Sequence, residues 1–150
     1  MRKALLAAEA VEEGEVVELL KALVRLPSHY PGPGEEGVVA FLEAYLQERG
    51  LKPFRQEVAP GRPNLVADLG EGEGSLILEG HTDVVTPGEE GLWTYPPYGA
   101  VVEGGRLYGR GACDMKGGLA ALVGALLAVK RVLGKPRRPR AWRPWRTRRG

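Results

Sequence analysis

The feature of the sequence that most limits its fold is a change in the spacing of its apolar residues. The first part of the chain has the spacing of helices. One apolar stripe ends at Leu26, where Pro27 stops the helix. A second helix is predicted over residues 34–49, and Gly50 is positioned to end it in the left-handed conformation. The amino-terminal third is therefore expected to be helical.

The spacing then becomes that of strands. Residues 64–69 and 75–79 are short runs rich in branched apolar side chains, and they predict strands, the second of them central. A loop with a short hairpin around residues 101–107 follows. A last helix is predicted over residues 117–133, with Gly134 ending it. Helices before and after strands predict an α/β fold, with helices packed on a mixed β-sheet.

Charge is divided unevenly along the chain. Residues 1–134 contain 13 Lys and Arg against 19 Asp and Glu, whereas residues 135–150 contain eight basic and no acidic residues. We predict an acidic folded part over 1–134 and a basic Arg/Pro/Trp tail over 135–150. Arg interleaved with Trp suits contact with nucleic acid. A disordered, solvated charge run is the favoured interpretation of the tail.

Cysteine content and hydropathy indicate the cellular compartment in which the chain is expected. The single cysteine, Cys113, excludes an internal disulfide, and no uninterrupted apolar run approaches the ~20 residues that cross a bilayer. Acidic residues from Glu9 onward interrupt the apolar start before any signal-peptide cleavage pattern. We therefore expect a cytoplasmic chain without a membrane partner. Cys113 could act as a nucleophile with His81 as its base, although a small buried cysteine is the favoured interpretation.

His81 and Asp83 follow directly after the second predicted strand. Residues two apart on a strand share a face, so both side chains are expected to project together at its carboxyl end. Ligand sites of open α/β sheets gather at such ends. A neutral imidazole oriented by a carboxylate is a good metal ligand. A histidine that merely caps a strand and pairs with Asp83 fits the same residues equally well.

Asp114 lies in the glycine-rich run Gly109–Gly118, immediately before the last predicted helix. Its two carboxylate oxygens could bridge two cations. Taken alone, however, Asp114 is favoured as the amino-terminal cap of that helix. Arg110 and Lys116 flank it and could support the loop or meet a substrate, with support favoured.

Taken together, these stretches resemble a known family. The residues 80–85 (GHTDVV), Trp93, Pro96–Pro97 and residues 109–118 (GRGACDMKGG) are similar, in order and spacing, to the amino-terminal portion of the dinuclear zinc metallopeptidases and deacylases. This family includes acetylornithine deacetylase, succinyl-diaminopimelate desuccinylase, aminoacylase and carboxypeptidase G. The resemblance covers about residues 19–134, so 1–134 is expected to be the amino-terminal part of a metallohydrolase catalytic domain.

The resemblance implies a role for each matching residue. His81 and Asp114 are expected as metal ligands, with Asp114 bridging two Zn²⁺ ions, or Co²⁺ in their place. Asp83 is the expected catalytic carboxylate that orients His81, and the peptide bond Asp114–Met115 is a candidate for the cis form. The implied reaction is metal-dependent hydrolysis of an N-acyl amino acid or small peptide, in which a glutamate is the general base.

The chain lacks the later part of this apparatus. After Lys116 it contains no carboxylate and no histidine, so the general-base glutamate and several metal ligands of the family are missing. We hypothesise that residues after about 136 are shifted translation of a GC-rich gene, which the other reading frames of the coding DNA would test. The chain alone is expected to be inactive or nearly so, to bind zinc weakly or not at all, and to self-associate through exposed apolar edges. A nucleic-acid-binding or interaction protein acting through the tail is the alternative function.

Overall fold

The computed structural model of the chain describes residues 2–70 and 75–134. In chain order its elements are α1 (Arg2–Glu9), α2 (Glu13–Arg25), α3 (Glu36–Glu48), β1 (Phe54–Ala59), β2 (Arg62–Val66), the 3-10 turn η1 (Glu90–Leu92), β3 (Val101–Glu103), β4 (Arg106–Tyr108), the irregular helical turn η2 (Ala112–Lys116) and α4 (Gly117–Leu133). The predicted α/β class is confirmed.

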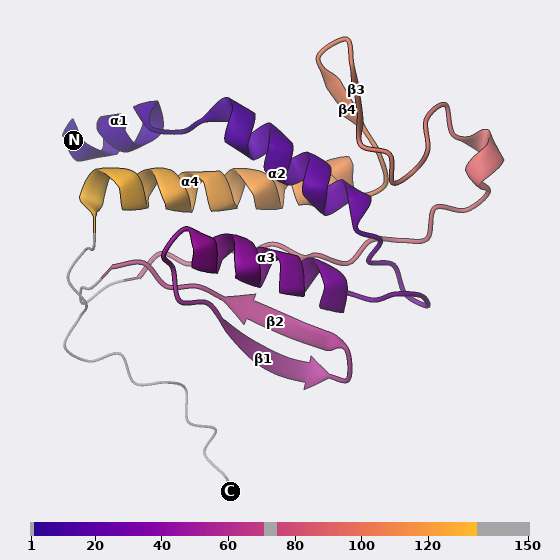
Figure 1. Cartoon of the computed structure of the whole chain (residues 1–150), viewed down its shortest axis with the longest axis horizontal. Helices are drawn as coiled ribbons and strands as arrows, with labels where there is room; N and C mark the ends of the chain where they lie inside the picture. The colour runs from indigo at the N-terminus through magenta and orange to yellow at the C-terminus, as the bar shows by residue number, and fades with distance from the viewer. Residues whose placement is uncertain (1, 71–74, 135–150) are drawn as a thin grey trace, which may run out of the picture.

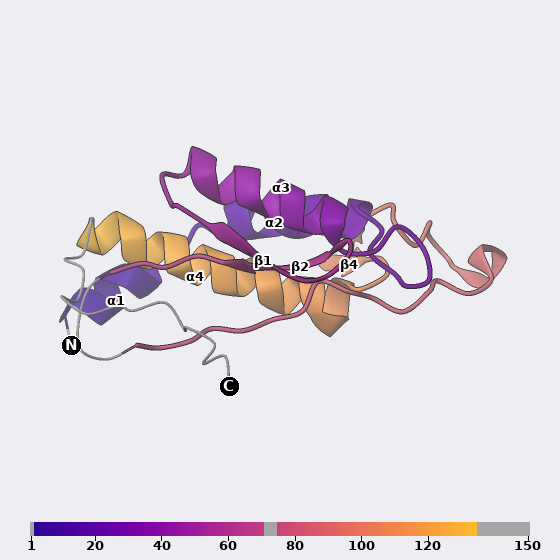
Figure 2. The ribbon, with the colours of Figure 1, turned by 90° about the horizontal axis from the view of Figure 1, so that it is seen from below.

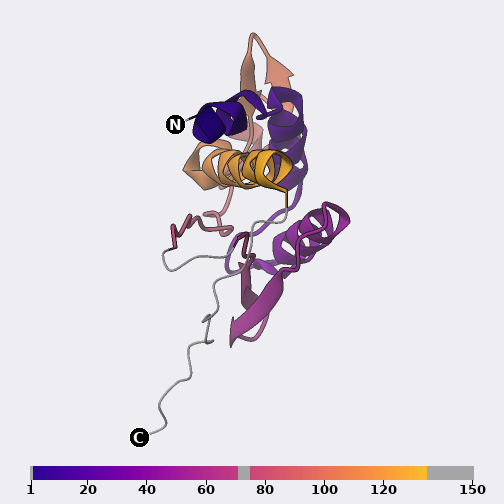
Figure 3. The same ribbon diagram turned by 90° about the vertical axis from the view of Figure 1, so that its left-hand side faces the viewer.

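Helix α4 lies at the centre of the arrangement. Figure 1 shows α1 and α2 along one side of α4, with α3 and the β1–β2 hairpin along the other side. The β3–β4 hairpin projects on the side of α2, near the end of α4 that follows η2. Figure 3, which looks along α4, shows the same order of layers. The last described helix therefore contacts elements from both sides of the molecule.

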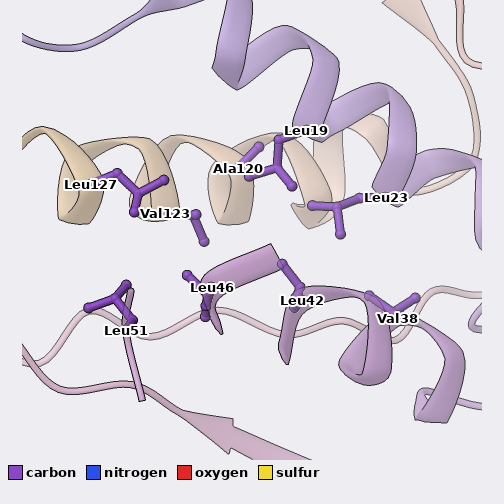
Figure 4. Close-up of a cluster of buried hydrophobic side chains, with 9 residues drawn as sticks. All are labelled: Leu19, Leu23, Val38, Leu42, Leu46, Leu51, Ala120, Val123 and Leu127. Carbon is purple, nitrogen blue, oxygen red and sulfur yellow. The ribbon is translucent and has the colours of Figure 1, made fainter. Parts of the chain in front are cut away.

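The hydrophobic core forms where α2, α3 and α4 meet (Figure 4). Each helix contributes side chains from one face, and one further leucine follows α3. The buried cluster consists of Leu19 and Leu23 from α2, Val38, Leu42 and Leu46 from α3, Leu51, and Ala120, Val123 and Leu127 from α4. Removing these apolar side chains from water is the main favourable term that holds the helices together.

Small residues let α2 approach α4 closely. Ala120, Gly124 and Ala128 are buried along one face of α4. A side chain at Gly124 would overlap Val16 of α2, so the hydrogen of glycine is what fits there. The small residues of α4 therefore allow the close contact between the two helices.

The helical stretch Ala112–Leu133 is long and apolar enough, by its 22 residues and mean hydropathy of 1.6, to meet a membrane-span criterion. The stretch is not an uninterrupted apolar run, because Asp114, Lys116, Lys130 and Arg131 lie within it. The apolar composition has a physical reason within the fold, since α4 packs against α2 on one side and faces α3 on the other. This criterion alone does not indicate a membrane span.

The predicted helices and the short hairpin are confirmed. Helix α3 lies within the predicted range 34–49, and α4 has the predicted bounds 117–133. Gly50 follows α3 with a left-handed φ of 71°, and β3 pairs with β4 as an antiparallel hairpin. Helix α1 is separate from α2, which the single predicted stripe did not distinguish.

The predicted central strand at residues 75–79 was wrong. In the described part of the chain the strands form two antiparallel two-stranded sheets, β1–β2 and β3–β4, and not one mixed sheet. Residues 75–79 belong to neither sheet; they run beside α4, where Gly80 lies near Leu119 and Leu122 (Figure 2). The physical reason is the lack of a neighbouring described strand with which this segment could pair.

The basic tail at residues 135–150 lies outside the described residues. Its expected disorder, its possible origin in a shifted reading frame and its alternative role in nucleic-acid binding therefore stay predictions from the sequence.

Candidate metal centre

The segment that carries His81 is fixed to the chain just after α2. The Ser28 hydroxyl donates a hydrogen bond of 2.6 Å to the Thr82 carbonyl, and the Val84 amide donates to the Ser28 carbonyl at 3.3 Å. His29 and Val84 also form an isolated parallel bridge. Because Ser28 is fully buried, these contacts hold residues 81–84 against the core.

The segment that carries Asp114 reaches the same place through a glycine. Gly111 has a left-handed φ of 79°, and a side chain there would overlap Val84. Glycine therefore satisfies both the backbone angle and the close approach of the two segments. Within the turn η2, Asp114 and Met115 depart from helical angles, and the peptide bond between them is cis, as predicted from the resemblance.

The three predicted site residues lie together. The Nε2 atom of His81 is 2.9 Å from Oδ1 of Asp114, and its Nδ1 atom is 3.0 Å from the Asp83 carbonyl oxygen. The Asp83 carboxylate is 3.3 Å from the same Nδ1 atom. Asp114 is separated from His81 by 33 positions in sequence, so the fold, and not the local chain, brings these two side chains into contact.

The surroundings of His81 favour its protonated form. Partial burial of the ring disfavours the charge. The hydrogen bonds to the Asp83 carbonyl and to the Asp114 carboxylate, with the negative charges of both aspartates, outweigh this effect and raise the pKa of His81. Both ring nitrogens face oxygen acceptors, an arrangement in which the imidazolium ion donates twice.

The donor set fits part of a zinc site. An imidazole nitrogen and a carboxylate oxygen are both zinc ligands. The two atoms are 2.9 Å apart, so a slight separation of the two side chains would let both bind one ion at bond lengths of about 2 Å. Asp83 on the opposite ring nitrogen suits the second-shell position of such a ligand. A catalytic zinc usually takes about three protein ligands. Within residues 2–70 and 75–134, no three His, Cys, Asp or Glu side chains are grouped to hold a metal.

The candidate centre opens into a cleft of about 400 Å³. His81, Asp114, Arg110 and Cys113 all line it. The side chain of Asp114 is 87% exposed, so solvent reaches the carboxylate that faces His81. Cys113 is also exposed, and the prediction of a buried cysteine was wrong, because η2 turns this residue toward the cleft instead of the core.

Asp114 is not the cap of α4. The residue at the capping position is Lys116, and no side-chain hydrogen bond caps the helix. Lys116 is fully buried and its ammonium group donates to the Leu23 and Leu26 carbonyls at 2.9 and 2.7 Å. Burial lowers the pKa of Lys116 to about 8. The contacts agree with the favoured interpretation of Lys116 as a support for the loop.

Sequence reasoning missed two contacts beside the centre. His29 is half-buried, and its Nδ1 atom is 2.8 Å from the Tyr98 hydroxyl. The Arg110 guanidinium lies over the Trp93 ring, 4.9 Å from its centroid. The sequence contained Trp93 and Arg110 in the quoted motifs, but nothing in their spacing indicated that they stack.

Comparison with known proteins locates these residues in a family. The profile of the family described as "Peptidase family M20/M25/M40" matches residues 77–141, a range that contains His81, Asp83 and Asp114. The chain is 48% identical over 114 residues to a succinyl-diaminopimelate desuccinylase of Methylobacterium sp. (strain 4-46), an alignment that covers 73% of this chain and 28% of that protein.

Two further desuccinylases give similar values. That of Rhodopseudomonas palustris (strain HaA2) is 46% identical over 115 residues, covering 74% of this chain and 29% of the relative. That of Gluconobacter oxydans (strain 621H) is 45% identical over 113 residues, covering 73% and 29%. The chain thus spans less than a third of the length of these relatives. Residues 77–141, which contain the paired His81 and Asp114, thus match peptidase family M20/M25/M40.

Proposed function

We propose that this chain carries the amino-terminal part of a zinc-dependent hydrolase that cleaves the acyl group from an N-acyl amino acid. Similarity to the desuccinylases favours a succinylated amino acid among the N-acyl amino acids and small peptides that the family motifs imply. The observation that carries the proposal is the 2.9 Å separation between His81 Nε2 and Asp114 Oδ1.

In this proposal each residue of the centre has a distinct task. Nε2 of His81 and the carboxylate of Asp114 would hold one Zn²⁺, and the same carboxylate would be available to a second ion. Asp83 accepts from Nδ1 of His81, which in the neutral ring would leave the lone pair of Nε2 for the ion. When bound, zinc supplies polarisation of a carbonyl group and a lowered pKa of water. Co²⁺ is the alternative ion.

We further propose that the 150-residue chain by itself hydrolyses amides poorly or not at all. The described residues offer two protein ligands, one fewer than a catalytic zinc usually takes. No glutamate follows Asp114 in the sequence, so nothing after this residue can serve as the general base that the family reaction uses. The proposal therefore assigns to the chain a share of a metal site and not a complete catalytic apparatus.

Metal titration of the purified chain tests the ligand assignment. Isothermal titration with Zn²⁺ and then Co²⁺ should give affinity weaker than micromolar for the wild type and lower still for His81→Ala and Asp114→Asn. The matched control is His29→Gln, because His29 is the other histidine of the chain. It should bind as the wild type does.

Two results would contradict the proposal in different ways. Equal zinc affinity in the wild type and in His81→Ala would show that His81 is not a zinc ligand. Sub-micromolar zinc affinity together with measurable release of succinate from an N-succinyl amino acid would show that the chain is complete, against the second part of the proposal.

A thiol mechanism with Cys113 as nucleophile is less well supported. Cys113 lines the same cleft as His81, which keeps the idea open to experiment. Both nitrogens of His81 already face the two aspartates, however, so neither is free to act as the base for a thiol. Alkylation that destroyed activity, with chelators leaving activity untouched, would favour the thiol mechanism instead.

A further inference from the structure

Arg110 is held in a fixed orientation at the wall of the cleft. Its backbone amide donates a hydrogen bond to the Pro97 carbonyl at 2.6 Å, which fixes the backbone of Arg110 against Pro97. Its guanidinium lies 4.9 Å from the centroid of the Trp93 ring. The Trp93 indole donates in turn to the Pro87 carbonyl at 3.0 Å, which limits rotation of the ring. Stacking therefore positions a planar cation in advance of any ligand.

This guanidinium has no acceptor within the described part of the chain. Its Nε atom is buried without a hydrogen-bond partner, and Arg110 is in none of the ion pairs formed among the described residues. The arginines that pair with glutamates are Arg49, Arg55, Arg62 and Arg131.

The cleft gives this unpaired cation a specific setting. Of the described residues that line the cleft, Arg110 is the sole Lys or Arg, and it shares the wall with His81 and Asp114. A guanidinium presents a pair of parallel N–H donors on its terminal nitrogens. A carboxylate matches this pair with two oxygens, and the resulting contact is stronger than a neutral hydrogen bond.

We propose that Arg110 binds a carboxylate group of the substrate beside the metal centre. The inference rests on the proposed function, because it takes the ligand of the cleft to be an acylated amino acid that carries a carboxylate. It adds a residue for recognition of the ligand's charge, placed on this chain and next to the two metal ligands. Arg110 is then a substrate-binding residue, and Trp93 is the residue that positions it.

Binding of succinate to the metal-free chain tests this inference. Succinamide has the same carbon skeleton without the charges and is the matched probe. The readout is the indole N–H resonance of ¹⁵N-labelled Trp93, which reports on the ring that contacts Arg110. The other two indoles, Trp142 and Trp145, lie in the basic tail and report separately on binding there.

Succinate should shift the Trp93 resonance saturably in the wild type, and succinamide should not. Arg110→Gln should weaken succinate binding by at least about tenfold, as expected for loss of a charge-assisted hydrogen-bond pair. Arg110→Lys keeps the charge but not the paired donors, so its affinity for succinate should lie between those of the wild type and Arg110→Gln. The control is Arg106→Gln, an exposed arginine on β4, and it should bind as the wild type does.

Several outcomes would overturn the inference. These are equal succinate affinity in Arg110→Gln, equal shifts by succinate and succinamide, and saturation at Trp142 and Trp145 without change at Trp93. If Arg110→Gln does not fold, the comparison of the two probes in the wild type still decides. Zinc titration of Arg110→Gln separates the two proposals, since zinc binding should persist where succinate binding is lost.

Discussion

Gly111 determines how closely the two candidate ligand segments can approach. It combines a left-handed φ of 79° with a position at which any side chain would overlap Val84. Val84 belongs to the same segment as His81, whereas Gly111 precedes Asp114 in the loop. The distance between the two candidate ligands therefore depends on the absence of a side chain at this position.

Replacing Gly111 by alanine should both destabilise the chain and separate His81 from Asp114. The left-handed backbone and the overlap with Val84 together predict a loss of roughly 2–4 kcal/mol in the free energy of unfolding. Urea unfolding followed by circular dichroism measures this loss. Gly91→Ala is the matched control, because a side chain there meets open space, and it should change stability by less than about 0.5 kcal/mol. Equal stability of the two variants would contradict the argument.

At this scale the sequence predicted which residues meet but not how they are surrounded. The pairing of His81 with Asp114 follows from motifs that keep their spacing, and the cis bond after Asp114 follows from the same resemblance. The exposure of Cys113 and the stacking of Arg110 on Trp93 depend on the path of the loop through space. No local pattern encodes that path.

Among the elements, a single carboxylate joins three helices. Glu15 of α2 accepts a 2.9 Å hydrogen bond from Arg49, which follows α3, and forms an ion pair with Arg131 of α4. Burial of Glu15 opposes its charge, but the hydrogen bonds from Arg131 and Arg49 outweigh this effect and lower its pKa. The charged form is therefore stabilised more in the folded chain than in the unfolded one.

The effect of pH follows from the sign of this shift. A carboxyl group whose pKa is lowered by folding stabilises the fold above its unfolded pKa, and the contribution is lost as pH falls through the folded pKa. Glu15→Gln should cost about 1 kcal/mol at neutral pH, a value reduced by the solvent that reaches both arginines. The difference from the wild type should shrink below the ordinary glutamate value of 4.5.

Thermal or urea unfolding at several pH values measures this difference. Glu18→Gln is the control, because Glu18 is 67% exposed and pairs with Lys21 on the same helix. It should change stability little at any pH. A cost of Glu15→Gln that stayed constant from neutral pH to well below 4.5 would refute the assigned role of the charge.

Helices were the elements that sequence spacing predicted best. The bounds of α4 agree with the prediction because its apolar face, its small residues and Gly134 all lie within one continuous stretch. The β3–β4 hairpin was predictable for the same reason, since its two strands are adjacent in sequence. The strand expected at residues 75–79 was not, because a strand needs a partner that its own residues do not specify.

Across the whole molecule, the segment at residues 75–79 leaves apolar side chains in water. Leu76 is 85% exposed, Ile77 is 80% exposed and Leu78 is 48% exposed. These side chains lie on a stretch whose backbone pairs with no described strand. Exposed apolar residues on an unpaired extended segment favour association with another extended segment.

We propose that the chain self-associates through this segment, with a second copy as its partner. Ile77→Lys should lower the average mass measured by sedimentation velocity, because the charge opposes close pairing of two such segments. Leu92→Lys is the control: Leu92 is 82% exposed but lies in η1, away from this segment. A wild-type chain that is monomeric at high concentration, or an equal effect of both substitutions, would contradict the proposal.

The contacts of Lys116 and Ser28 have a consequence for how the centre tolerates change. Lys116, in the Asp114 loop, is bonded to the carbonyls of Leu23 and Leu26, and Ser28 is bonded to Thr82, in the His81 segment. The segments that carry the two candidate ligands are thus both hydrogen-bonded to residues 23–28, at the end of α2. A shift of that stretch carries the two together as a unit, so their mutual spacing can survive rearrangements that alter the rest of the molecule.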